Sequence, residues 1–317
     1  MDLWGGVDFG GTNIQLGLVT RQGRVVAQKT LLTRAHADPA AFVEGVASTL
    51  RVLAHAKGAR LRGVGVGAPG LIDVRRGVIA QLVNVPGRWR GVRLGALMGR
   101  RLGCPCSIDN DVNAVALGEW SFGAGRGTEH SVYVTLGTGV GGGLVVNSRL
   151  VRGAIGSAGE IGHTSIALAG PLCACGRRGC LEAFVSTRAI LRRARRAIRG
   201  GAAVLRSLVE GHGTLTPEVV ARAAASGDRA ARQIWHEVGV SLGRGLANVI
   251  NLLNPQRIVI GGGVAKAWRF FAPSLHATLN LYAFDAPLKA VRVVRAQLGD
   301  RAGIIGGACL AWEKGEG

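Results

Sequence analysis

Three cysteines and a histidine stand close together in the chain. His163 is followed by Cys173, Cys175 and Cys180, and glycines at 176 and 179 let the short loop turn back on itself. Three thiolates and an imidazole form the ligand set of a closed, tetrahedral zinc site. Because four protein ligands leave no open position for catalysis, the spacing predicts a structural Zn²⁺.

Three glycine turns each follow an apolar, strand-like run: Gly10-Gly11, residues 137–143 and residues 261–263. Glycine permits positive φ and lets a phosphate approach main-chain N–H donors. Three such turns favour a cradle for a nucleoside triphosphate. Asp8, beside the first turn, is placed to hold Mg²⁺ through water, since magnesium keeps much of its hydration shell.

Two other nucleotide motifs fit the sequence less well. A Walker A loop is absent, and the G-x-G-x-x-G match at residues 137–142 is followed by a strand and a turn. The dinucleotide fingerprint must instead open a helix. A dehydrogenase is therefore disfavoured.

Acidic residues form a third group. Asn110-Asp111 follows a strand and begins a helix, while Glu160 and Glu182 flank the proposed zinc loop. The plain interpretation of Asp111 is a helix N-terminal carboxylate, favoured by the macrodipole. The functional one is a general base or orienter for a substrate hydroxyl, as phosphoryl transfer requires. Two carboxylates and an imidazole on one clamped loop predict a wall that binds a polyol.

The elements that must position these residues alternate between strands and helices. The pattern of strand, glycine turn and strand occurs at residues 3–19 and again at 132–146, a weak internal repeat. We expect an α/β protein with a small domain of residues 1–113 plus 299–317 and a large domain of residues 114–298. Apolar periodicity predicts further strands and helices at residues 24–33, 39–57, 64–66, 112–120, 187–199, 217–225, 230–253, 258–260 and 303–312. Residues 67–70 should form a loop.

Composition narrows the class of protein. The 317 residues are 48% hydrophobic and 18% charged, which excludes a disordered chain. Because no apolar run is long enough to span a membrane and no secretion signal opens the sequence, we expect a cytoplasmic protein without a membrane partner. The net charge of +20 is almost all arginine spread along the chain, so no specific nucleic-acid partner is expected.

Together these motifs resemble the ROK family of repressors, open reading frames and kinases. The motifs that carry the resemblance are Asp8-Phe9-Gly10-Gly11-Thr12, Asn110-Asp111-Val112-Asn113-Ala114, residues 136–143, Glu160-Ile161-Gly162-His163 and the cysteine run through Glu182. The resemblance implies a two-domain, actin-like (ribonuclease-H-like) ATPase fold with a cleft between the domains. Its kinases transfer phosphate from ATP, with Mg²⁺, to the 6-hydroxyl of hexoses or acyl-amino sugars.

The resemblance also implies a role for each matched residue. Asp111 would be the catalytic base, and the sugar contacts would be Gly67, Asn110, Asp111, Glu160, His163 and Glu182. His163 would serve both as a zinc ligand and as a sugar contact. The residues facing phosphates and metal would be Asp8, Gly10, Gly11, Thr12, Thr138 and Gly139. Gly262 and Gly263 would approach the adenosine.

Residues 84–91 and 123–127 are most similar to bacterial glucokinases of the family, which favours glucose as the sugar. Arg88, Val112 and residues 183–187 depart from the glucokinase pattern. An N-acetylmannosamine or fructose kinase and a polyphosphate-using glucokinase share every motif named. A non-catalytic, sugar-responsive DNA-binding regulator is the alternative of another class. Family repressors carry a winged helix-turn-helix before the first glycine turn, whereas Asp8 lies close to the start of this sequence. The regulator is therefore disfavoured. The resemblance further implies a homodimer or homotetramer.

Overall fold

The computed structural model describes residues 1–83 and 85–313 and divides the chain into two compact units. The first comprises Met1–Tyr133, Gly143–Gly159 and the described residues from 296 onward; the second comprises Val134–Gly142 and Glu160–Arg295. The expected domains, residues 1–113 plus 299–317 and residues 114–298, stay a prediction. Asn84, in the glucokinase-like segment, and residues 314–317 lie outside the described residues.

A mixed five-stranded sheet organises the first unit, in the order β3-β2-β1-β4-β7. Its strands are β1 (Asp2–Phe9), β2 (Asn13–Val19), β3 (Val25–Leu32), β4 (Arg60–Ala68) and β7 (Cys106–Asn110). β1 runs parallel to β4, and β4 runs parallel to β7. Asp8 pairs with Gly67, which pairs with Asp109. The carboxyl ends of these three strands therefore lie at one edge, where open α/β sheets place ligands.

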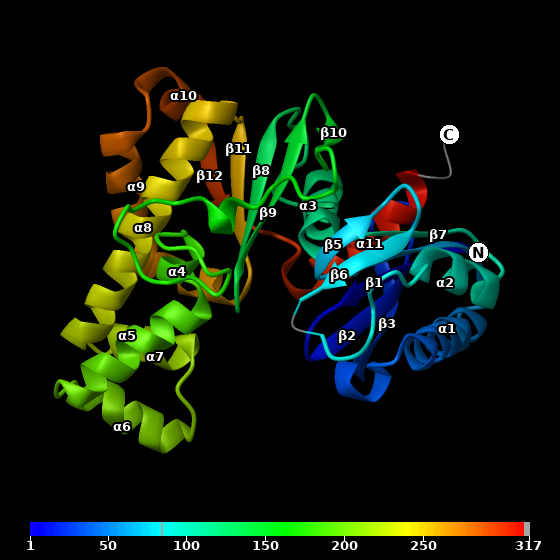
Figure 1. Cartoon of the computed structure of the whole chain (residues 1–317), viewed down its shortest axis with the longest axis horizontal. Helices are drawn as coiled ribbons and strands as arrows, with labels where there is room; N and C mark the ends of the chain where they lie inside the picture. The colour runs from blue at the N-terminus through cyan, green and yellow to red at the C-terminus, as the bar shows by residue number, and fades with distance from the viewer. Residues whose placement is uncertain (84, 314–317) are drawn as a thin grey trace. The chain divides into compact units, whose positions relative to one another are not determined.

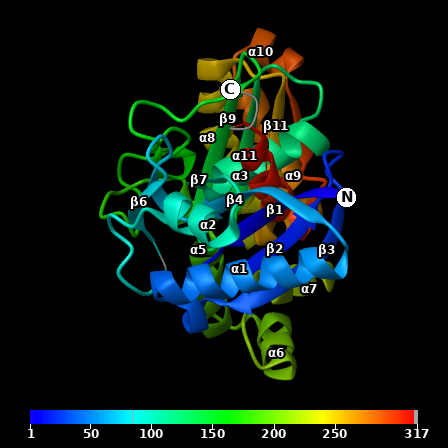
Figure 2. The ribbon, with the colours of Figure 1, turned by 90° about the vertical axis from the view of Figure 1, so that its right-hand side faces the viewer.

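Helices cover both faces of this sheet. On one face lie α1 (Pro39–Ala56) and α2 (Leu94–Leu102), and α1 crosses in front of the strands in Figure 2. On the other lie α3 (Asp111–Phe122) and α11 (Ala302–Glu313). Successive glycines of β1 show the alternation, because a Cβ on Gly5 would meet Leu50 of α1 and one on Gly6 would meet Ile304 of α11. The aromatic rings of Phe9, Phe42 and Trp89 pack together in the core on the α1 side.

A second five-stranded sheet has the order β10-β9-β8-β11-β12. Its strands are β8 (Ser131–Leu136), β9 (Val140–Val146), β10 (Arg149–Leu150), β11 (Arg257–Gly261) and β12 (Arg292–Arg295). Numbered within each sheet, both orders read 3-2-1-4-5. The repeat that the sequence indicated only weakly is thus confirmed at the level of topology.

The remaining helices belong to the second unit. They are α4 (Glu182–Val185), α5 (Thr187–Arg199), α6 (Ala203–His212), α7 (Pro217–Ala225), α8 (Arg229–Leu253), α9 (Trp268–Tyr282) and α10 (Asp285–Ala290). The long α8 lies against α9 (Figure 1). Glycines permit this close approach, because a Cβ on Gly239 would lie 2.0 Å from Ser274 Oγ and one on Gly243 would lie 2.6 Å from Thr278 Cβ.

Three expectations about local structure need correction. β9 already begins at Val140, so the second glycine turn is shorter than residues 137–143, and its last three glycines lie in a strand. The loop expected at residues 67–70 is mostly strand: β4 extends through Ala68, and Gly70 opens the hairpin of β5 (Gly70–Asp73) and β6 (Val78–Leu82). The expected strands and helices omitted the helices α2, α4, α6, α9 and α10 and the strands β5, β6, β10 and β12. Among the described helices, none combines the length and apolarity that a membrane crossing requires.

Candidate active site

The corner between β7 and α3 holds the proposed base. Asn110 caps α3 by accepting hydrogen bonds from the backbone N–H groups of Val112 and Asn113, while its amide donates to the carbonyl of Gly70 at 3.1 Å. Asp111 is the first helical residue, and its Oδ1 accepts from Val112 N–H at 2.9 Å. The helix start thus holds the Asp111 carboxylate at the carboxyl edge of the sheet.

The carboxylate of Asp109, which is buried and 1% exposed, holds this corner through hydrogen bonds. Its Oδ1 accepts from the backbone N–H of Asn110 at 2.7 Å and from the amide of Asn113 at 2.9 Å. Arg152 Nε donates to its Oδ2 at 2.6 Å. Sequence reasoning assigned no role to either member of this pair. The acid-amide-acid run at 109–111 was the available signal for Asp109, but nothing local identifies an arginine 43 positions away.

Asp8 lies at the end of β1, beside the start of α11. A Cβ on Gly303 would come within 2.4 Å of Asp8 Oδ2, so only glycine fits there. Burial, and secondly the neighbouring carboxylate of Asp111, raise the pKa of Asp8 to about 7. A bound divalent cation would offset the repulsion between these two carboxylates and so favour the ionised form of Asp8. The pair therefore fits the expected Mg²⁺.

The first glycine turn continues directly from Asp8. Gly10 N–H donates to the carbonyl of Asn13 at 3.0 Å, and Thr33 closes the turn from β3's end, with its hydroxyl on Gly10 O and its N–H on Thr12 O. Gly11 and Thr12 are exposed at its tip. Neither glycine has positive φ. At Gly10 the turn uses glycine for its small size, because a Cβ there would lie 2.8 Å from Asn13 O.

Gly67 lies buried inside β4. A Cβ there would meet Ala114 Cβ at 2.9 Å and Asp111 Cα at 3.2 Å. Glycine at this position lets α3 approach the sheet, which brings the backbone of Asp111 next to β4. A direct contact between Gly67 and a sugar stays a prediction.

In the second unit, Glu182 joins the second glycine turn to the cysteine loop. It is the first residue of α4, and its Oε2 accepts from Val140 N–H at 2.9 Å. Its Oε1 lies 3.6 Å from Cys173 Sγ. A Cβ on Gly139 would lie 2.6 Å from Glu182 Oε2, so a larger residue there would displace this carboxylate. Thr138 is exposed at the tip of the turn.

The four predicted zinc ligands converge. Their ligand atoms all lie within 4.8 Å of one another. Cys173 Sγ is 3.8 Å from His163 Nδ1, and Cys175 Sγ is 3.7 Å from Cys180 Sγ. Bonds of about 2.3 Å to a tetrahedral zinc ion place sulfur atoms about 3.8 Å apart, so these spacings fit the metal.

His163 presents its two ring nitrogens to different neighbours. While Nδ1 faces Cys173, Nε2 lies 3.9 Å from Glu160 Oε2. The Glu160 side chain is 62% exposed and the His163 side chain 36%. A metal-bound histidine commonly directs its other nitrogen to a carboxylate, which agrees with this orientation.

The third glycine turn follows β11. Gly262 has φ of 86°, and a Cβ there would lie 2.3 Å from Leu136 O, so this position requires glycine. Gly263 is exposed and opens a 3₁₀ helix, Gly263–Ala267. The exposed backbone suits the predicted approach of an adenosine.

The predicted site residues thus form local groups within each unit. The first unit gathers Asp8, Gly67, Asn110 and Asp111 at one sheet edge, next to the first glycine turn. The second unit gathers Glu160, His163, the three cysteines and Glu182 around one loop.

Two sheets of order 3-2-1-4-5, with an acidic helix start after the fifth strand, define an actin-like (ribonuclease-H-like) ATPase fold, which solved relatives share. The sequence profile described as the ROK family matches residues 4–314, and the chain belongs to this family.

Several relatives resemble the chain along nearly its whole length. A glucokinase of Halalkalibacterium halodurans is 37% identical over 310 residues, covering 96% of this chain and 93% of that protein. A glucokinase of Thermotoga maritima is 36% identical over 314 residues, covering 98% and 97%. The crystal structure of a ROK family glucokinase from Streptomyces griseus, in complex with glucose and AMPPNP, matches with a TM-score of 0.82 at 31% identity, covering 98% of this chain and 99% of that one.

Proposed function

We propose that this chain is a sugar kinase that transfers the γ-phosphoryl group of ATP to the 6-hydroxyl of glucose. The observation that carries the proposal is the Asp111 carboxylate, held at the start of α3 by the Asn110 cap and by the buried Asp109, which pairs with the half-buried Arg152. Likeness to glucokinases along the full chain supports glucose as the acceptor.

In this reaction Asp111 acts as the general base. Its carboxylate takes the proton from the 6-hydroxyl while the sugar oxygen forms a bond to the γ-phosphorus and the bond to the β-phosphate oxygen breaks. ADP leaves with the electron pair of that bond. Because phosphoryl transfer depends mainly on positioning and charge stabilisation, the rigid support of Asp111 is the chief contribution of the β7–α3 corner.

Asn110, Glu160, His163 and Glu182 are proposed to bind the sugar hydroxyls, with the buried Gly67 packing beneath Asp111. Glu182 supports this role through its fixed orientation, since Val140 N–H holds one carboxylate oxygen. A structural Zn²⁺ on His163, Cys173, Cys175 and Cys180 would keep this loop rigid. It would supply no step of the reaction.

The glycine turns are proposed to hold the nucleotide. The exposed Gly11, Thr12 and Thr138, with the half-buried Gly10 and Gly139 beside them, suit phosphate oxygens, and the exposed Gly262-Gly263 suits the adenosine. Bound Mg²⁺ would neutralise phosphate charge, and Asp8 is the residue we expect to hold it. A cytoplasmic location and assembly as a homodimer or homotetramer complete the proposal.

A sugar panel tests the substrate. ADP release is measured with ATP and, in turn, glucose, mannose, fructose and N-acetylmannosamine, and the product with glucose is identified by ³¹P NMR. We expect the highest kcat/KM with glucose and a 6-phosphate product. Preference for another sugar would overturn glucose as the acceptor. If no sugar of the panel led to ADP release, the proposal that the chain is a sugar kinase would be overturned.

A further inference from the structure

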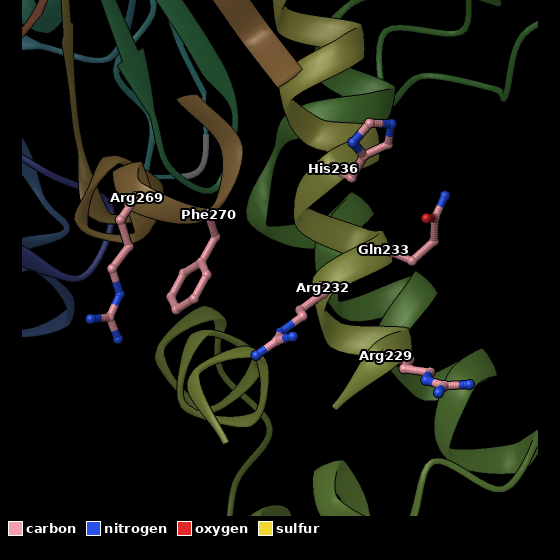
Figure 3. A pocket seen from close by; sticks show the side chains of 6 residues that line it. All are labelled: Arg229, Arg232, Gln233, His236, Arg269 and Phe270. Carbon is pink, nitrogen blue, oxygen red and sulfur yellow. The ribbon is translucent and has the colours of Figure 1, made fainter. Parts of the chain in front are cut away.

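A basic hollow of about 440 Å³ lies between the beginning of α8 and the beginning of α9, within the second unit (Figure 3). It is lined by Arg229, Arg232, Gln233, His236, Arg269 and Phe270. The four residues from α8 stand at intervals of three and four positions, so they follow one side of the helix. None of them belongs to the residues proposed for phosphoryl transfer.

The charge of this hollow has one sign. Of the residues lining it, three are arginines and none is acidic. The acidic side chain of Glu237 contacts one lining residue, since its Oε1 accepts from the Gln233 amide at 3.2 Å. Glu237 also pairs with Arg193 at 3.0 Å, so its charge is already matched. The concave wall therefore favours an anion.

Two of the guanidinium groups are held in place by other contacts. Arg232 Nε donates to the carbonyl of Ala224 at the end of α7, at 3.0 Å, which leaves its terminal N–H groups for another acceptor. The Arg269 guanidinium lies over the ring of Phe270, 4.6 Å from its centre. Figure 3 shows Arg232 reaching from α8 toward Phe270. Preorganised guanidinium groups suit the planar, bidentate recognition of phosphate.

We propose that this hollow binds an anion carrying two or more phosphate groups. Three arginines from two helices present more donors than one phosphate group uses, and His236 and Gln233 extend the wall along α8. The shared chemistry is a phosphate chain, which an inorganic oligophosphate or a nucleoside diphosphate supplies. The inference is independent of the proposed kinase activity.

The test is a calorimetric titration of the full-length protein in about 150 mM salt, where weak surface attraction is screened. Inorganic tripolyphosphate and ADP are titrated separately. A variant, Arg229→Gln/Arg232→Gln/Arg269→Gln, removes the three guanidinium groups. Its matched control, Arg195→Gln/Arg196→Gln/Arg199→Gln, removes the same charge from exposed positions of α5.

We expect wild type and the α5 control to bind one more equivalent of at least one probe than the hollow variant does. The probe that shows the difference names the source of the phosphate chain. The hollow variant should keep kcat and the KM for ATP within about twofold of wild type, which separates this site from the proposed kinase site.

Equal binding by wild type and the hollow variant would overturn the proposal. So would an equal loss in the α5 control, because that result means attraction by net charge alone. If the triple variant does not fold, Arg229→Gln/Arg269→Gln replaces it. That pair leaves the Arg232 bond to Ala224 intact, and a loss of at least tenfold in affinity is expected from it.

Discussion

Asp109 and Asp111 are two positions apart, yet their surroundings suit them to different roles, Asp109 to positioning and Asp111 to proton transfer. Asp109 is buried against the guanidinium of Arg152 and the amide of Asn113, with no room for a substrate. Asp111 opens a helix, and its Oδ1 accepts from the Val112 N–H in the first turn. We therefore treat Arg152 and Asp109 as positioning residues, which act through the corner that carries the base.

Replacing Arg152 by methionine tests that role. The change leaves a buried carboxylate without its cation, and we expect kcat to fall between about tenfold and a hundredfold because the base is misplaced. The KM for glucose should change by less than about threefold. The free energy of unfolding should fall by about 2 kcal/mol, since Asp109 keeps two other donors.

The matched control is Arg149→Met, which removes an exposed arginine three positions earlier. Steady-state kinetics and urea unfolding are measured on both variants. Arg152→Lys should recover part of the lost kcat. A higher KM with unchanged kcat in Arg152→Met would assign Arg152 to binding and contradict the positioning role.

Asp8 provides a prediction about pH. Its folded pKa of about 7 lies above the usual carboxyl value, so the metal-free fold favours the protonated form. The stability that protonated Asp8 contributes is present at low pH and is lost as pH rises through about 7. Asp8→Asn stays neutral. Its free energy of unfolding, relative to wild type, should rise by about 2 to 3 kcal/mol between pH 5 and pH 8.

Urea unfolding without magnesium or nucleotide, at pH 5 and at pH 8, measures this difference. The same variant should lose activity, because the carboxylate that we expect to hold Mg²⁺ is gone. A stability difference that does not change with pH would show that Asp8 is ionised throughout, contrary to its burial beside Asp111.

At the scale of elements, the cysteine loop contains little regular secondary structure that could hold its shape. Residues 164–181 contain no helix or strand, only isolated bridges such as Ser165 with Cys180. Such a segment needs another constraint to hold Glu182 and His163, and we propose that zinc bound by the convergent thiolates supplies it.

Cys175→Ser tests this constraint. Metal analysis should find about one zinc ion per chain in wild type and much less in the variant. Because His163 and Glu182 flank the loop, the KM for glucose should rise by a larger factor than kcat falls. Cys104→Ser, outside the cluster, is the control and should keep its zinc. Fully active wild-type protein without zinc would remove the metal from the account.

The contact between α3 and α11 relies on glycine. A Cβ on Gly306 would lie 1.7 Å from Ala114 O, a clash that only a backbone shift relieves. Gly306→Ala should therefore lower the free energy of unfolding by about 3 kcal/mol. Because α3 begins with Asp111, kcat should fall as well.

Gly211→Ala is the control for Gly306→Ala. Gly211 lies in α6, and a Cβ there meets nothing within 4 Å, so alanine should stabilise the protein by about 0.5 kcal/mol. Chemical denaturation compares the two variants. A Gly306→Ala protein as stable as wild type would mean that the two helices separate at little cost.

For the whole molecule, the sequence predicted well what depends on local pattern. The helix over residues 187–199 follows from its periodicity, and the convergence of Cys173, Cys175 and Cys180 follows from their spacing. The Asp109–Arg152 pair joins distant segments, so no local rule predicts it. The second glycine turn was drawn too long because glycines inside β9 carry no local sign that they pair as a strand.

The arginines behind the net charge of +20 have different surroundings in the structure. Some arginines of α5 and α8 serve the fold: Arg193 pairs with Glu237, and Arg232 bonds to the end of α7. Others line the hollow beside α9. The surplus is therefore partly structural, and the calorimetric titration decides whether the rest has a ligand.

The central claim for the whole molecule is that many residues bind the sugar, while one residue, Asp111, takes the proton from its 6-hydroxyl. Turnover of glucose by Asp111→Asn, with the Kd for glucose and the unfolding curve measured alongside, tests it most directly. We predict a loss of about 10² to 10⁴ in kcat, with a folded protein and a Kd within about threefold of wild type. Near-wild-type turnover by the folded variant would contradict the account.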